Sequence, residues 1–250
     1  MTISVLKSTV FTTHRQDLQS YFGLPRWGMQ NSKPNIYLIE SKSRQDLAGM
    51  FMRFQEHYES PQFRGKTFTI EEFAHWYASR YGSFSYAKDW YGFNIPGTVL
   101  APFRDGNFDP LTDKEKKLMD LCRNAGDNSY IIGVTPSADY FKETVQHEFV
   151  HGAFYTNSEY RKEVEACVES YRIKPINNGL RKMGYCDDVA VDETNAYVLV
   201  EPDTVQEYVS IQNTKKLREG LDRIFEKHFG FSLLGVQISV LMAKTEHVLI

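Results

Sequence analysis

The chain has 250 residues, of which 42% are hydrophobic and 24% charged, with a formal net charge of −3 and a pI near 6.2. A hydrophobic fraction of this size supports a sizeable folded core and excludes a largely disordered chain. The small net charge, without lysine- or arginine-rich runs, gives no electrostatic basis for binding nucleic acid, so we expect no nucleic-acid partner.

Cysteine usage and hydropathy indicate the compartment. Cys122, Cys167 and Cys186 are odd in number and widely spaced, which predicts reduced thiols rather than a disulfide framework. The N-terminus shows no basic leader followed by an apolar stretch, so we expect a cytoplasmic protein, with non-classical export left open. The most apolar run, residues 229–242, is shorter than the roughly twenty residues that a membrane span needs, and we read it as a core element.

The first half of the chain predicts one strand and three helices. Two of these helices begin with capping boxes, in which a threonine and the glutamate three residues later each accept a hydrogen bond from the other's backbone N–H. The predicted elements are a strand at 36–39, a helix at 44–58, a helix opening at Thr69 with Glu72, an irregular stretch at 82–110, and a helix opening at Thr112 with Glu115.

A strand followed by a helix is predicted next. Residues 129–134 are rich in β-formers and lie between turn-forming residues, which is typical of a short strand. Thr135, Pro136 and Ser137 then offer a capping hydroxyl and a proline in the first helical turn. The helix itself is indicated by apolar residues at helical spacing, namely Phe141, Val145, Phe149, Val150 and Ala153.

This predicted helix carries the run His147-Glu148-Phe149-Val150-His151, an H-E-x-x-H motif. Positions i and i+4 of a helix lie on one face, so His147 and His151 can ligate one metal ion. A zinc ion held in this way lowers the pKa of a bound water from 15.7 to roughly 7, and Glu148 is placed to act as its general base.

The motif, with the strand before it, resembles the zincin metallopeptidases. The resemblance implies an α+β fold, a zincin-like catalytic domain with its active-site helix packed under a small mixed sheet. In zincins the edge of a strand above that helix binds an extended substrate backbone, which implies peptide binding along residues 130–134. The alternative for these residues is a plain core strand.

The third metal ligand distinguishes the zincin subfamilies. The metzincin pattern requires glycine and histidine at positions 154 and 157, where this chain has Phe154 and Asn157. A gluzincin instead takes a glutamate from a later helix, and the segment 158–171 offers candidates. They are Glu163, Glu165 and Glu169, of which Glu169 has the most thermolysin-like spacing but lacks an aspartate four residues later.

We prefer Glu193, in a stretch similar to the D-E-x-x-A-Y helices that supply the third ligand in smaller gluzincin-like families. It follows His151 by 42 residues (193 − 151), room for one helix, a turn near 177–179 and a return helix. The small side chain of Ala196 would let that helix pack closely against the motif helix. The alternative is that Glu193 is a solvated acid in a first helical turn.

The chemistry implied is zinc-dependent hydrolysis of peptide bonds, with a peptide or protein as substrate. His147, His151 and Glu193 would hold the Zn²⁺ ion, and Glu148 would be the catalytic base. An oxyanion donor is also expected; Tyr155, Tyr185 and Tyr197 are the nearby phenols, and Tyr197 is the candidate that we name without committing to it.

We expect the chain to consist of two regions. Residues 1–110 are expected to supply part of the sheet and a wall of the cleft, and residues 111–250 the catalytic region with C-terminal helices, together forming one compact unit.

The same metal ligands and base would also serve a metal-dependent hydrolase of a non-peptide amide. A zincin-fold binding or scaffolding protein with a vestigial site is the remaining alternative, although Glu148 would then have no role.

Overall fold

The computed structural model describes residues 35–136, 140–171, 174–183, 187–208 and 211–250. Residues 34–250 form one compact unit of the α+β class. The first third of the predicted region 1–110 lies outside the described residues, as do Ser137, Tyr185 and Cys186.

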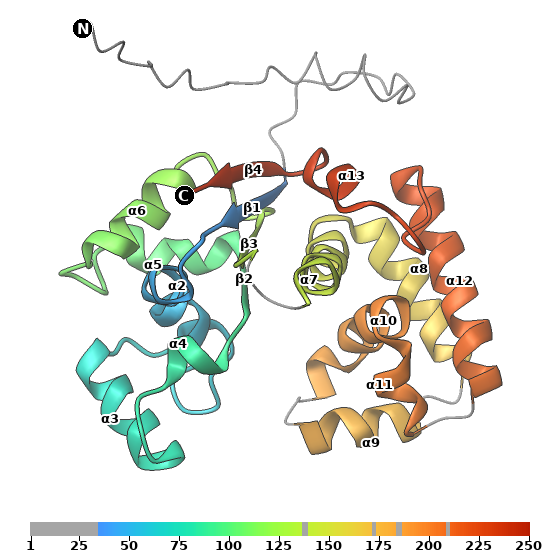
Figure 1. Ribbon diagram of the computed structural model, residues 1–250, viewed down its shortest axis with the longest axis horizontal. Helices are drawn as coiled ribbons and strands as arrows, with labels where there is room; N and C mark the ends of the chain where they lie inside the picture. Colours follow the sequence, from blue (N-terminus) through green and yellow to red (C-terminus); the bar gives the residue numbers. More distant parts are fainter. Residues whose placement is uncertain (1–34, 137–139, 172–173, 184–186, 209–210) are drawn as a thin grey trace, which may run out of the picture. The chain divides into compact units, whose positions relative to one another are not determined.

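A mixed sheet of four short strands forms the centre of this unit (Figure 1). The strands are β1 (Ile36–Glu40), β2 (Gly92–Pro96), β3 (Tyr130–Val134) and β4 (Glu246–Leu249), arranged in the order β2-β3-β1-β4. Strand β1 pairs in parallel with β3 and β4, whereas β2 pairs antiparallel with β3. The sheet therefore combines strands from both sides of residue 110.

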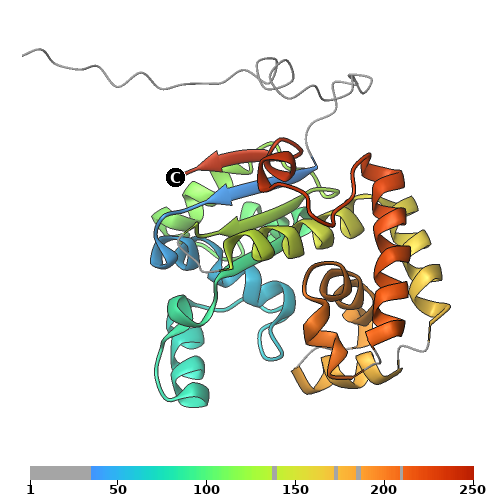
Figure 2. The same ribbon diagram turned by 45° about the vertical axis from the view of Figure 1, so that its right-hand side comes forward.

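Helices cover both faces of the sheet, because successive side chains of a strand point to opposite faces. Ile36 and Leu38 of β1 belong to one apolar core and Tyr37 and Ile39 to a second core on the other face. The first core holds α7 (Phe141–Thr156), α8 (Ser158–Glu169), α10 (Ala190–Val200) and α12 (Ile211–Phe229), and the second holds α2 (Arg44–Glu59) and α6 (Asp113–Leu121). Figure 2 shows α7 running along the sheet, with α8 and α12 packed side by side beyond it.

Shorter elements connect these layers. The capping boxes predicted at Thr69 and Thr112 are both present and open α3 and α6. The remaining elements are α3 (Ile70–Tyr81), α4 (Tyr86–Asp89), the 3₁₀ turn η1 (Gly97–Leu100), α5 (Ala101–Arg104), α9 (Lys174–Met183), the 3₁₀ turn η2 (Asp187–Val189), α11 (Pro202–Gln206) and α13 (Ile238–Met242).

The expectation that residues 130–134 bind a peptide by strand addition is wrong, and the alternative of a plain core strand is confirmed. Strand β3 lies between β2 and β1, so both of its edges are already paired. The sheet ends in β2 on one side and in β4 on the other, and β2 falls inside the stretch 82–110 that we predicted to be irregular. Its glycine and proline are tolerated because an edge strand leaves alternate backbone N–H groups outside the ladder.

One further detail differs from the sequence predictions. The turn predicted near 177–179 lies inside α9, where Ile176 and Leu180 are buried one helical turn apart. Gly179 is a contact point rather than a breaker, since a Cβ there would come within 2.4 Å of the Tyr208 ring.

Gly152 allows α7 to lie close to the sheet. A Cβ built at this position would come within 3.1 Å of Ile36 and 3.2 Å of Tyr130, so a larger residue would push the helix away from the sheet. The helix continues through the glycine to Thr156. Residue 152 directly follows His151, and the close approach therefore fixes the motif helix against β1 and β3.

Cys122 and Cys167 are free thiols. None of the helices in the described ranges is long and apolar enough to cross a bilayer.

A buried ion pair joins α2 to α6. Nε and Nη2 of Arg53 donate to the two carboxylate oxygens of Glu115, both at 2.6 Å, and both side chains are buried. A bidentate pair of this kind has a defined geometry as well as a favourable energy. It holds the part of α2 from which Gln55 reaches β2.

We expect Glu115→Ala to lower the free energy of unfolding by about 3–5 kcal/mol, because it leaves the buried Arg53 guanidinium without its partner. Urea denaturation measures the loss. Lys114→Ala is the matched control, since Lys114 pairs with Asp46 across the same two helices but on the surface. Equal losses in the two variants would contradict this role of the buried pair.

Candidate metal centre

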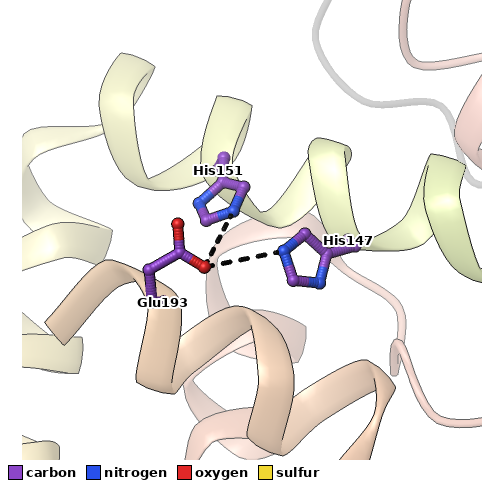
Figure 3. Close-up of side chains that lie close together, drawn as sticks. All are labelled: His147, His151 and Glu193. Atoms are coloured by element: carbon purple, nitrogen blue, oxygen red, sulfur yellow. Dashed lines mark ion pairs between the residues drawn. The ribbon is translucent and has the colours of Figure 1, made fainter. Parts of the chain in front are cut away.

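Helix α7 presents the motif residues on one side and an apolar stripe on the other. Val145, Phe149 and Val150 are buried in the core, which fixes the rotation of the helix. His147 and His151 then project together from the opposite side, toward α10 (Figure 3). The i, i+4 spacing predicted from the sequence therefore places both imidazoles at one point.

Helix α10 brings Glu193 to the same point. Its Oε2 atom lies 3.8 Å from Nε2 of His147 and 3.8 Å from Nε2 of His151 (Figure 3). Helices α7 and α10 pack against each other, and Ala196 is fully buried, in agreement with the expected small residue at this contact. Within the described ranges these are the three residues whose geometry would allow them to share one metal ion.

The three side chains fit a metal ion in burial and spacing. His147, His151 and Glu193 are 9%, 4% and 9% exposed, so Glu193 is not the solvated acid of the alternative interpretation. Its Oε2 atom is buried without a hydrogen-bond partner, which is costly for a carboxylate. Tetrahedral ligands with bonds of about 2.0–2.2 Å lie roughly 3.4 Å apart. The two Glu193–histidine distances are 3.8 Å, and the ligand atoms of all three residues lie within 4.8 Å of one another.

Two further carboxylates orient the imidazoles. Nδ1 of His147 donates to Glu201 Oε2 at 2.8 Å, and Nδ1 of His151 is 2.9 Å from Asp192 Oδ2. A carboxylate on Nδ1 leaves Nε2 free to face a metal ion and raises the basicity of the ring. Both imidazoles are thus held in the orientation that ligation requires.

The centre contains more negative than positive charge. Glu148, Asp192, Glu193 and Glu201 surround two imidazoles, and no lysine or arginine of the described residues forms an ion pair with them. Burial alone would lower the pKa of each histidine, but the carboxylates outweigh it and raise the pKa of His147 to about 9 and that of His151 to about 10. Without a metal both imidazoles therefore hold a second proton near neutral pH, whereas a bound divalent cation would require both of them to be neutral.

The carboxylate of Glu148 is held by the edge strand of the sheet. The amide of Asn94 on β2 donates to Glu148 Oε2 at 2.6 Å, and the hydroxyl of Tyr130 on β3 donates to Asn94 Oδ1 at 2.7 Å. The second bond fixes which end of the Asn94 amide faces Glu148. Burial raises the pKa of Glu148, while the neighbouring histidines and Asn94 partly oppose the increase.

The other predicted candidates lie elsewhere. Glu163 pairs with Lys227 and His228 on α12, and Glu165 and Glu169 are not part of the cluster in the described chain. Of the tyrosines, Tyr197 lies beside the centre, its ring 4.8 Å from that of His147, and Tyr155 donates to the backbone of Asp127. An oxyanion role for Tyr197 stays a prediction.

Sequence reasoning missed most of the residues around the ligands. Glu201 lies 54 positions from His147, and Asn94 lies 54 positions from Glu148, so no local pattern relates either pair. Asp192 is the aspartate of the D-E-x-x-A-Y stretch that contains Glu193, and no role was predicted for it. Its position immediately before the third ligand was the one available signal for an orienting carboxylate.

The chain was compared with models of protein families, with curated proteins and with solved structures, and it has no significant match in any of the three.

We expect the metal-free protein to bind one Zn²⁺ ion and Glu193→Gln to weaken that binding by a factor of about 100 or more, because a ligand oxygen is replaced by a neutral amide. Isothermal titration with Zn²⁺ measures the affinity. Glu165→Gln is the control from the competing helix and should bind like the unmodified chain. An unchanged affinity in Glu193→Gln would exclude this ligand set.

The stability of the metal-free protein should fall as the pH rises. The folded pKa values of about 9 and 10 lie above the ordinary value near 6.5, so protonation of His147 and His151 favours the folded state. This contribution is complete below pH 6.5 and is lost as the pH passes through 9 to 10. Urea midpoints measured in EDTA should therefore fall more steeply for the unmodified chain than for His147→Gln/His151→Gln, and parallel slopes would contradict the assignment.

Proposed function

We propose that the chain is a zinc-dependent metallopeptidase with a zincin-like, gluzincin-type catalytic domain. The observation that carries the proposal is the convergence of His147, His151 and Glu193, with Glu148 next to them on α7. Two imidazoles and one carboxylate are the ligand set of catalytic zinc sites that keep a fourth position open. The active-site helix under a mixed sheet with an antiparallel edge strand supports the same class.

The presence of a base next to the ligands favours catalysis over a structural metal. A bound zinc ion supplies a Lewis acid that polarises a carbonyl and lowers the pKa of water. A structural site has no use for a carboxylate like that of Glu148, which is held in place by Asn94 and Tyr130. Four protein ligands would also be expected in a closed structural site, whereas three converge among the residues that the structure describes.

Glu148 acts as the proton carrier. Asn94 occupies its Oε2 atom, which leaves Oε1 to take a proton from the attacking water and to return it to the leaving amine nitrogen. The raised pKa of Glu148 makes it a stronger base than an exposed glutamate. Asp192 and Glu201 keep the two imidazoles in place during the reaction.

Peptides or proteins are the proposed substrates, and the cytoplasm is the proposed compartment. Strand β2 supports the choice of substrate, because it is an edge strand whose Asn94 contacts the proposed base. An extended peptide beside β2 would lie within reach of Glu148. Hydrolysis of a non-peptide amide would use the same centre but would not need the strand.

We expect Glu148→Gln to lower peptide hydrolysis by about 1,000-fold while Zn²⁺ affinity stays within a few-fold, because the variant loses a proton acceptor and keeps all three ligands. A fluorogenic peptide library measures the activity, and titration calorimetry measures the metal. Glu143→Gln, on the same helix but outside the cluster, is the matched control. Retention of full zinc-dependent hydrolysis by Glu148→Gln would refute the proposed mechanism.

A further inference from the structure

Asn94 of strand β2 makes two separate contacts, one with its side chain and one with its backbone N–H. It pairs with β3 on one side, and no described strand pairs with its other edge. The side chain of Asn94 holds Glu148, and a Cβ built at Gly92 would lie 3.5 Å from Glu148 Oε1. The free edge of β2 therefore passes directly beside the proposed base.

The side chain of Gln55 already occupies this edge. The backbone N–H of Asn94 donates to Gln55 Oε1 at 3.0 Å, and this is the bond by which an added strand would attach. Gln55 comes from α2, packs against β2 and is 7% exposed. The next residue facing the same way, Pro96, has no N–H to offer, so Asn94 supplies the central donor of the edge.

Gln55 uses both ends of its amide. Its Nε2 atom donates to Glu59 Oε1 at 2.6 Å, one turn further along α2. A primary amide that accepts from Asn94 and donates to Glu59 presents the same two groups as a peptide bond. Glu59 itself is exposed, so an incoming N–H group could reach its carboxylate once the Gln55 amide has left.

We propose that Gln55 is an internal substitute for a peptide group of the substrate and that it gates the edge of β2. An extended peptide displaces the Gln55 side chain, its carbonyl accepts from the Asn94 backbone N–H, and one of its N–H groups takes over the bond to Glu59. The gate favours ligands that offer an acceptor and a donor together, as unfolded polypeptide does. This inference rests on the proposed peptidase function for its biological meaning, but its test measures binding alone.

The test uses the full chain with Glu148→Gln, saturated with Zn²⁺, and fluorescein-labelled β-casein as the unfolded probe. Removing the gate with Gln55→Met or Gln55→Ala should lower the Kd, measured by fluorescence anisotropy, at least fivefold, because the probe no longer competes with the side chain. Gln45→Ala, an exposed glutamine on the same helix, should leave the Kd unchanged. An unchanged or higher Kd in the folded Gln55 variants would overturn the proposal.

A second measurement covers the case in which neither Gln55 variant folds, as judged by circular dichroism. In the Glu148→Gln chain, titration with β-casein should shift the NMR signals of the Asn94 backbone amide and of the Gln55 side-chain NH₂ group together. Absence of both shifts at saturating probe would overturn the gate. If the unmodified chain hydrolyses no peptide but the Kd falls in the Gln55 variants, the peptidase proposal fails and the gate stands. If the unmodified chain hydrolyses peptides but the Kd does not fall in the Gln55 variants, the gate fails and the peptidase proposal stands.

Discussion

The burial of several carboxylates at the contact of α7 and α10 is the constraint on which the rest of the site depends. Glu148 and Glu193 lie in the interior, and the only cationic partners in the described chain are two imidazoles. Buried carboxylates without cationic partners are costly, so the site favours protonated imidazoles or a bound cation. The raised pKa values of both histidines are the metal-free response to this constraint, and a divalent ion on neutral imidazoles is the alternative.

The scaffold keeps this charged centre in one geometry. Gly152 lets α7 approach the sheet closely, and the stripe through Phe149 fixes the rotation of the helix. Asn195 of α10 exchanges hydrogen bonds with the Tyr160 hydroxyl on α8, which anchors the helix that carries Glu193. Each of the three metal-ligating side chains is on a helix packed into the core. The centre is therefore in position before a metal ion or substrate binds.

The part of the site that follows helical periodicity could be predicted from the sequence. His147 and His151 share a face because of their spacing, and Glu193 was preferred because its stretch resembles the D-E-x-x-A-Y helices of smaller gluzincin-like families and has a small residue for helix packing. The contacts of Asn94 and Glu201 could not be predicted, because they depend on how distant elements meet. Strand β2 was missed since its five residues contain glycine and proline, and Gly179 was taken for a turn although the ring of Tyr208 packs against it.

The central claim is that His147, His151 and Glu193 hold a zinc ion with an open position. X-ray absorption spectroscopy of the protein loaded with one equivalent of Zn²⁺ tests it most directly. The account predicts a four-coordinate ion with two imidazole nitrogens at about 2.0–2.1 Å and oxygen ligands from one carboxylate and one water at about 2.0–2.2 Å. Sulfur at about 2.3 Å, a shell without two imidazoles or the absence of stoichiometric zinc would contradict it.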